Sequence, residues 1–183
     1  MAYDPRKHHR RSIRLPHYDY ASNGFYFVTI CAYQKQCLFG EIENGTMILN
    51  GCGQIVADEW QRSSQIRREI ELDLWVVMPN HFHGIVIIDR RDRETVITQK
   101  RDRYSIPFQK PRSLSSLVSG FKSSVSRRIN QYRRTPEHPV WQRNYHEHII
   151  RNQRSLQQIR EYVQNNPQLW DKDCLNPKNP SKW

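Results

Sequence analysis

The stretch from residue 72 to residue 88 constrains the fold more than any other part of this chain. Two apolar runs, 72–78 and 85–88, are separated by the turn dipeptide Pro79-Asn80. The runs are rich in Val, Ile and Trp and too short for helices, so they predict two β-strands joined by a tight turn. Because side chains alternate along a strand, His81 and His83 should share one face while Phe82 points to the other.

The two histidines have apolar neighbours, where unpartnered imidazoles would be costly. An isolated His-x-His in a strand is usually two unrelated residues, but a shared divalent metal ion would remove that cost. Two nitrogen ligands do not hold a metal ion alone. The pair therefore predicts a metal site with a third ligand elsewhere in the chain.

Charge and cysteine content narrow the function classes. The 183 residues suit one domain, and 29 Lys and Arg against 18 Asp and Glu give a net charge of +11. This charge favours an anionic polymer as partner, with nucleic acid first and a membrane surface second. No apolar run approaches the roughly 20 residues that span a bilayer. Four cysteines without a CxxC pair indicate reduced thiols and a cytoplasmic protein.

The remaining pattern predicts alternating strands and helices. Strands are expected at 24–32 and 140–150, a small hairpin at 39–42 and 47–49, and helices at 53–66, 113–134 and 152–166. This divides the chain into a basic arm at 1–23, a domain at 24–170 with a variable insertion at 90–112, and an extended tail at 171–183.

Basic side chains of the arm and of the 113–134 helix are candidates for DNA contact. They are Arg10, Arg11, Arg14, Lys122, Arg127 and Arg128. A second His-x-His, His146 and His148, is a rival metal site, although its more polar surroundings favour a structural or DNA-contact role.

The last predicted helix carries a candidate nucleophile. Tyr162 and Asn166 are four residues apart, so they lie on one helix face, beside the apolar stripe. The Asn166 amide oxygen is a suitable third ligand for Mg²⁺ or Mn²⁺, and the Tyr162 hydroxyl lies one turn away. A tyrosine so placed can attack a phosphate in line and form a phosphotyrosine, which keeps the energy of the phosphoester. Such a reaction is reversible and rejoins DNA without ATP.

Taken together, these sequence features resemble those of the REP-associated tyrosine transposases, in the single-tyrosine branch of the HUH (His-hydrophobic-His) endonuclease superfamily. The similarity spans about residues 10–167 and rests on six blocks, at 10–20, 26–31, 77–84, 121–122, 141–145 and 162–167. Met-Pro-Asn-His-x-His-Gly followed by a distant Tyr-x-x-x-Asn-Pro is its most specific part.

The resemblance implies an α+β, ferredoxin-like (RRM-like) single domain, with an antiparallel sheet and helices packed on one face. It implies His81, His83 and Asn166 as metal ligands and Tyr162 as the nucleophile. It also implies an enzyme of DNA transposition and recombination. Such enzymes cleave and rejoin single-stranded DNA at short palindromic (REP-like) hairpins through a 5′-phosphotyrosine. A monomer is expected rather than a helix-swapped dimer.

Two other functions compete with strand transfer. A basic hairpin-binding protein that does not cut DNA would show the same charge. An RNA-binding ferredoxin-like domain would need aromatic side chains on the open sheet face, where the two histidines are expected instead.

Overall fold

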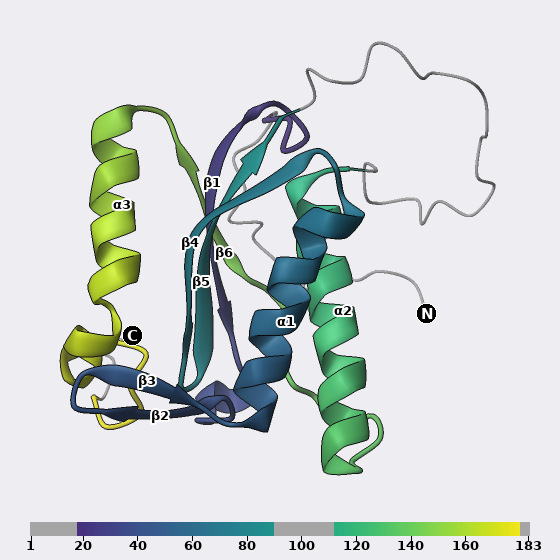
Figure 1. Ribbon diagram of the computed structural model, residues 1–183, viewed down its shortest axis with the longest axis vertical. Helices are drawn as coiled ribbons and strands as arrows, with labels where there is room; N and C mark the ends of the chain where they lie inside the picture. Colours follow the sequence, from purple (N-terminus) through teal and green to yellow (C-terminus); the bar gives the residue numbers. More distant parts are fainter. Residues whose placement is uncertain (1–17, 90–111, 180–183) are drawn as a thin grey trace, which may run out of the picture.

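A four-stranded antiparallel sheet forms the centre of the protein. The computed structural model describes residues 18–89 and 112–179 (Figure 1). The sheet order is β4-β5-β1-β6, with β1 at Gly24–Cys31, β4 at Ile70–Met78, β5 at His81–Ile88 and β6 at His146–Ile150. β2 (Gly40–Glu43) and β3 (Thr46–Leu49) form the separate hairpin. The predicted α+β class, antiparallel sheet and single domain are confirmed.

Helices cover both faces of this sheet, rather than the one face predicted. α1 (Gly51–Ile66) and α2 (Leu114–Arg133) pack side by side on one face, and α3 (Gln153–Asn165) lies against the other (Figure 1). The alternation of β1 divides its side chains between two cores. Val28 and Ile30 join the larger core under α1 and α2, whereas Phe27 joins a smaller core with Leu156 and Val163 of α3.

Side-chain caps set where the helices begin. Asn50 accepts hydrogen bonds from two backbone N–H groups at the start of α1, and Asn152 accepts one at the start of α3. Ser113 and Ser116 form a reciprocal capping box at the start of α2. Pro167 follows α3 and opens a 3₁₀ turn, η3 (Pro167–Lys172).

Two predicted segments differ from the structure. The strand predicted at 140–150 is ordered as β6 only from His146, with a single bridge earlier between Trp141 and Ala32. Between them, the carbonyl groups of residues 142–144 accept hydrogen bonds from the Lys122 ammonium group, so this backbone leaves the sheet. The tail predicted to be extended instead folds back after η3, where Asn176 is buried.

Gly84 in the His-x-His-Gly block allows α1 to pack closely on the sheet. A Cβ atom there would lie 2.7 Å from the Trp60 ring and 2.8 Å from the Phe82 ring. Both rings are fully buried. Gly84 therefore leaves space for tight packing of the core on the sheet face opposite the histidines.

We expect Gly84→Ala to lower the free energy of unfolding by about 1–3 kcal/mol, the usual cost of overpacking a core. Urea unfolding followed by circular dichroism would measure it. Gly120→Ala is the matched control, because a Cβ atom there meets only the end of the Arg67 side chain, at 3.5 Å. This exposed helical site should gain up to about 1 kcal/mol. Equal stability of the two variants would contradict the packing role of Gly84.

Candidate metal centre and nucleophile

Strand β5 places His81 and His83 on the face that α3 covers. Their ring centroids lie 4.5 Å apart, and the two residues are 0% and 2% exposed. On β1, Cys31 pairs with His81 and Thr29 with His83. The predicted sharing of one face is thus confirmed, and Phe82 packs on the opposite side.

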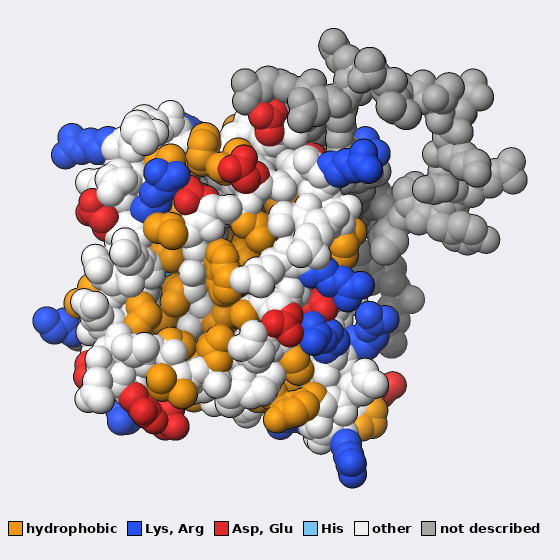
Figure 2. All heavy atoms as spheres, viewed as in Figure 1, with side chains coloured by type: hydrophobic (Ala, Val, Ile, Leu, Met, Phe, Trp, Pro, Cys, Tyr) orange, Lys and Arg blue, Asp and Glu red, His pale blue; other side chains and the backbone are white. Residues whose placement is uncertain are grey.

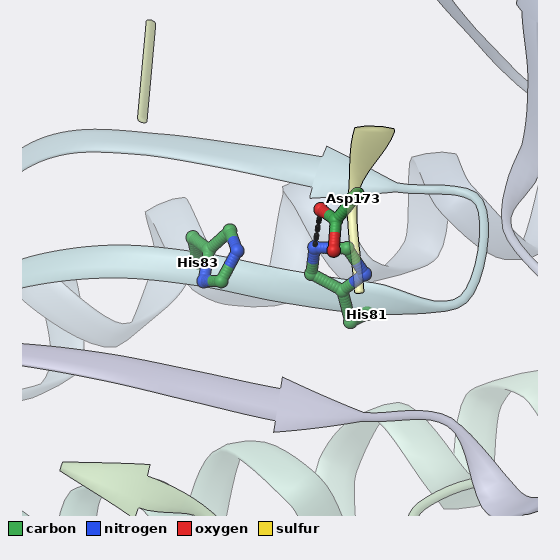
Figure 3. Close-up of side chains that lie close together, drawn as sticks. All are labelled: His81, His83 and Asp173. Atoms are coloured by element: carbon green, nitrogen blue, oxygen red, sulfur yellow. Dashed lines mark ion pairs between the residues drawn. The ribbon is translucent and has the colours of Figure 1, made fainter. Parts of the chain in front are cut away.

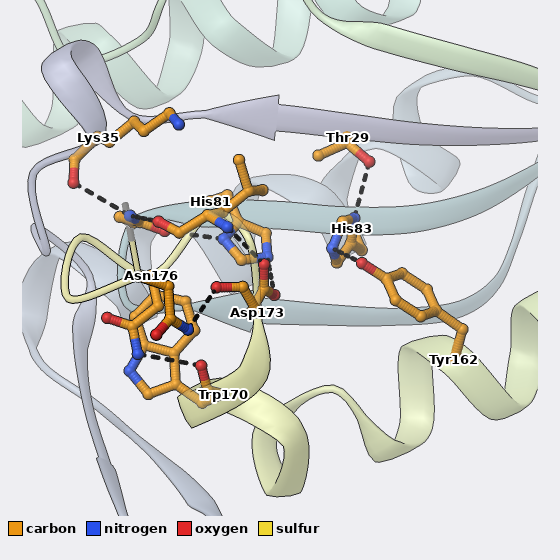
Figure 4. Close-up of polar contacts among 11 residues, drawn as sticks. Thr29, Lys35, His81, His83, Tyr162, Trp170, Asp173 and Asn176 are labelled. Atoms are coloured by element: carbon orange, nitrogen blue, oxygen red, sulfur yellow. Dashed lines mark hydrogen bonds and ion pairs between the residues drawn. The ribbon is translucent and has the colours of Figure 1, made fainter. Parts of the chain in front are cut away.

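Each imidazole is held through its Nδ1 atom. His81 Nδ1 lies 2.8 Å from Asn80 Oδ1, and His83 Nδ1 lies 2.8 Å from the Thr29 hydroxyl. Partners of this kind orient histidine ligands in metal sites. His81 Nε2 is left without a hydrogen-bond partner among the described residues, and His83 Nε2 lies 3.2 Å from the Tyr162 hydroxyl (Figure 4).

Tyr162 reaches the site from α3, as predicted. Its ring packs edge-on against His83 and Phe27, with centroid distances of 5.2 and 6.1 Å. The residue is 43% exposed, so its hydroxyl touches the buried site while part of its side chain remains open to solvent. Arg160, two residues earlier, donates two hydrogen bonds to Asp73 of β4 and ties α3 to the sheet.

Asn166 ends α3 beside the histidines. It is 2% exposed, and its amide oxygen is buried without a hydrogen-bond partner in the described part of the chain. The amide is close enough to influence the pKa values of both His81 and Tyr162. The structure therefore gathers the four groups selected from the sequence.

Asp173 is a further potential ligand that the sequence did not reveal. Its Oδ2 atom lies 3.8 Å from His81 Nε2 and has no hydrogen-bond partner among the described groups. Ligand atoms of His81, His83 and Asp173 all lie within 4.8 Å of one another (Figure 3). Asp173 belongs to the folded-back tail, a segment without the periodicity that would assign it to the site.

Burial sets the protonation states at this site. It lowers the pKa of His81 to about 4, with the Asp173 carboxylate acting in the opposite direction. Burial, with the charges of His81 and His146, holds the pKa of His83 well below its ordinary value. Burial and then the charge of Asp173 raise the pKa of Tyr162 to about 12. At neutral pH the imidazoles are therefore uncharged and the phenol is protonated.

The residues at this site fit a divalent cation. Three buried atoms of the residues at this site lack partners in the described part of the chain, namely His81 Nε2, Asn166 Oδ1 and Asp173 Oδ2. His81 Nε2 and Asp173 Oδ2 lie 3.8 Å apart, and the Asn166 amide is close enough to influence the pKa of His81. Unpartnered buried polar atoms are costly, and a cation would satisfy all three. Two imidazoles and two oxygen donors form a mixed set for a divalent cation, in which the oxygen atoms suit Mg²⁺ or Mn²⁺.

The second His-x-His does not form a rival cluster. His146 and His148 are exposed on the edge strand β6, on the same sheet face as His83. Within the described ranges, the only group of three or more potential metal-binding side chains is that of His81, His83 and Asp173.

Two of the predicted DNA contacts are engaged within the protein. Lys122 donates to the carbonyl groups of residues 142–144, and Arg128 pairs with Glu59 and Asp58 of α1, at 2.9 and 3.3 Å. Arg127 is exposed. Arg10, Arg11 and Arg14 lie outside the described residues, as does most of the predicted insertion.

Basic side chains on the face seen in Figure 2 lie mainly at its margins, with apolar and uncharged groups between them. Most of the net positive charge of the chain lies outside the described residues. The residues outside the described ranges contain 13 of the 29 Lys and Arg but only four of the 18 Asp and Glu. The described domain is therefore close to neutral, at +2, and most of the net charge belongs to the arm and the 90–111 segment.

The fold and the site define an antiparallel-sheet protein with a histidine pair, a helical tyrosine and a candidate divalent-metal centre. Its sequence is 42% identical over 179 residues to an uncharacterized protein of Haemophilus influenzae, covering 92% of this chain and 93% of that protein. The chain belongs to the same family as that protein. No family model matches it.

A solved structure shares the fold. It is that of the REP-associated tyrosine transposase bound to a REP hairpin, with a TM-score of 0.58 at 17% identity, covering 95% of this chain and 91% of that one. The resemblance to REP-associated tyrosine transposases is thereby confirmed at the level of the fold. Among the described residues, no helix has the length and apolar character to cross a membrane.

Proposed function

We propose that this protein acts in the cytoplasm as a metal-dependent single-stranded DNA endonuclease and strand transferase, at short palindromic, REP-like hairpins. The observation that carries the proposal is the meeting of Tyr162 with His83, at 3.2 Å, beside the unpartnered atoms of His81, Asn166 and Asp173. The transposase that shares its fold is described as bound to a REP hairpin, which supports hairpin DNA as the substrate.

In the proposed reaction, the Tyr162 hydroxyl loses its proton and its oxygen attacks the scissile phosphorus. The bond from phosphorus to the 3′ oxygen breaks and the departing oxygen takes up a proton from solvent, which leaves a free 3′ hydroxyl on one strand and a 5′-phosphotyrosine on the protein. The 3′ hydroxyl of another end reverses these steps and frees Tyr162. The pKa of Tyr162, about 12, means that the phenol needs help to ionise at neutral pH.

The chain's own residues hold the reacting groups in place. His81, His83 and Asn166, with Asp173 as a fourth donor, would hold Mg²⁺ or Mn²⁺. When bound, the cation supplies Lewis-acid polarisation of a phosphate oxygen and fixes its orientation. The Arg160–Asp73 pair fixes α3, so that Tyr162 stays over His83. We propose that the protein acts as a monomer rather than as a helix-swapped dimer.

The basic arm supplies the charge for binding DNA in this proposal, through Arg10, Arg11 and Arg14, with Arg127 on the domain. The near-neutral charge of the described domain supports this assignment. Lys122 and Arg128 are left out of the proposed DNA surface, because both already have partners within the protein.

The test is formation of a covalent adduct. Wild-type protein incubated with Mn²⁺ and labelled hairpins with single-stranded flanks should give a slowly migrating band on a denaturing gel, and Tyr162→Phe should give none. The tyrosine hydroxyl competes for the His83 Nε2 atom, so its removal should leave Mn²⁺ affinity unchanged or raise it by up to about tenfold, the worth of one hydrogen bond. Calorimetry would measure that affinity.

An adduct formed by Tyr162→Phe would contradict the proposed nucleophile. The competing function, a hairpin-binding protein that does not cut, predicts another pattern. Hairpin affinity would then be unchanged in EDTA, and no metal ion would support cleavage by the wild type.

A further inference from the structure

Asn80 occupies a central position between the metal site and the folded-back tail. It lies in the turn between β4 and β5, directly before His81, and is 1% exposed. Its side chain bonds to three separate parts of the chain, namely His81, the carbonyl group of Lys35 and the carbonyl group of Leu175. Figure 4 shows His81, Lys35 and Asp173 gathered at this end of β5.

The two carbonyl partners fix the orientation of the amide. Carbonyl oxygens only accept hydrogen bonds, so the groups of Lys35 and Leu175, at 3.0 and 2.7 Å, require the Asn80 nitrogen on their side. The amide oxygen must then face His81 Nδ1, at 2.8 Å. That oxygen cannot donate, and therefore His81 must carry its hydrogen on Nδ1.

This tautomer leaves the lone pair of His81 on Nε2, the unpartnered atom that faces Asp173. Thr29 cannot impose the same choice on His83, because its hydroxyl can either donate or accept. Asn80 thus determines which nitrogen of His81 is available to the site.

Asn80 also reaches Asp173, through Leu175. The Leu175 carbonyl accepts from Asn80, and the Leu175 N–H donates to Asp173 Oδ1 at 2.7 Å. With Oδ1 engaged in this way, Oδ2 is the atom that faces His81 Nε2, at 3.8 Å. The buried Asn80 amide is therefore connected directly to His81 and, through Leu175, to the Asp173 carboxylate.

We propose that Asn80 is the positioning residue of the metal centre, which fixes the tautomer of His81 and holds the Asp173 segment beside it. This inference rests on the proposed function, since it assumes that the site binds a divalent cation. Loss of a partner that orients a metal ligand typically lowers metal affinity 10- to 100-fold.

The first measurement needs no variant. Nitrogen-15 NMR of the metal-free wild-type protein, at a pH where His81 is neutral, reports which ring nitrogen carries the hydrogen. The expected result is hydrogen on Nδ1 of His81. Hydrogen on Nε2 would overturn the proposal, whether or not any variant folds.

The second measurement compares Asn80→Ala with Asn176→Ala. Asn176 also stabilises the tail, through bonds to the Trp170 carbonyl and the Lys178 N–H, but it does not contact His81. Asn80→Ala should lose the fixed tautomer and bind Mn²⁺ about 10- to 100-fold more weakly in calorimetry. Asn176→Ala should keep hydrogen on Nδ1 and lose less affinity. Urea unfolding of both variants would establish that they are folded.

The outcomes separate this inference from the proposed function. A wild-type protein that binds no Mn²⁺ would refute the metal-dependent function, while its His81 tautomer would still decide whether Asn80 acts as described. Normal Mn²⁺ binding by wild type and by a folded Asn80→Ala would refute the role of Asn80 alone.

Discussion

Replacing His81 or His83 with alanine is expected to lower the yield of covalent DNA adduct by more than about 100-fold. Each substitution removes a nitrogen donor from the proposed metal centre, and loss even of an outer partner costs 10- to 100-fold in metal affinity. Both imidazoles are neutral at pH 7 because burial lowers their pKa values, so each offers a lone pair to a cation. Denaturing gels would measure the loss of covalent adduct, and calorimetry would measure the loss of Mn²⁺ affinity.

The second His-x-His supplies the matched control. His148→Ala removes an imidazole from the same sheet face, but from an exposed position on the edge strand. It should leave Mn²⁺ affinity within about twofold of wild type. Replacement of His81 or His83 should instead lower Mn²⁺ affinity strongly. A loss of Mn²⁺ binding in His148→Ala, with binding retained in His81→Ala, would move the metal site to β6.

The sequence predicted those parts of the fold that depend on the spacing of residues close together in the chain. The hairpin that carries His81 and His83 follows from two apolar runs around Pro79-Asn80, and α2 follows from a repeated apolar spacing capped by Ser113. Tyr162 and Asn166 could be placed on one helix face for the same reason. In each case, backbone geometry converts spacing along the chain directly into position.

The parts that were missed depend on contacts between distant segments. Asp173 reaches His81 only because the chain folds back after η3, and no spacing in the tail encodes that fold. Lys122 was selected as a candidate DNA contact, but its ammonium group donates to carbonyl groups about 20 residues further along the chain. Arg128 likewise finds its acidic partners on α1, about 70 residues away.

The choice of the sheet face that α3 covers also depends on contacts between distant segments. Its apolar stripe shows that the helix packs on something, but the stripe does not identify the face of the sheet. Phe27, Ile85 and Ile150 provide a second apolar face on the histidine side, so the helix packs there. β1 reads as one continuous apolar run because it is covered on both sides, which hides the alternation that would have revealed two layers.

The metal-free protein is expected to lose stability as the pH falls below about 6.5. An unfolded histidine has a pKa near 6.5, whereas in the folded protein the pKa of His81 is about 4 and that of His83 is well below its ordinary value. Between pH 4 and about 6.5 the unfolded chain binds more protons than the folded protein. The free energy of unfolding therefore rises with pH in this range and levels off above about 6.5. His81 alone contributes on the order of 3 kcal/mol, lost as the pH falls through 4.

Urea unfolding in EDTA at a series of pH values between 4 and 8 would measure this dependence, with EDTA removing the cation that would otherwise stabilise the neutral imidazoles. His81→Gln should flatten the slope by up to about 1.4 kcal/mol per pH unit between 4 and 6.5, since one proton-binding difference is removed. A wild-type profile that is flat between pH 4.5 and 7 would mean that the buried imidazoles protonate in place, and the site would then be too open to water to hold two neutral donors ready for a metal ion.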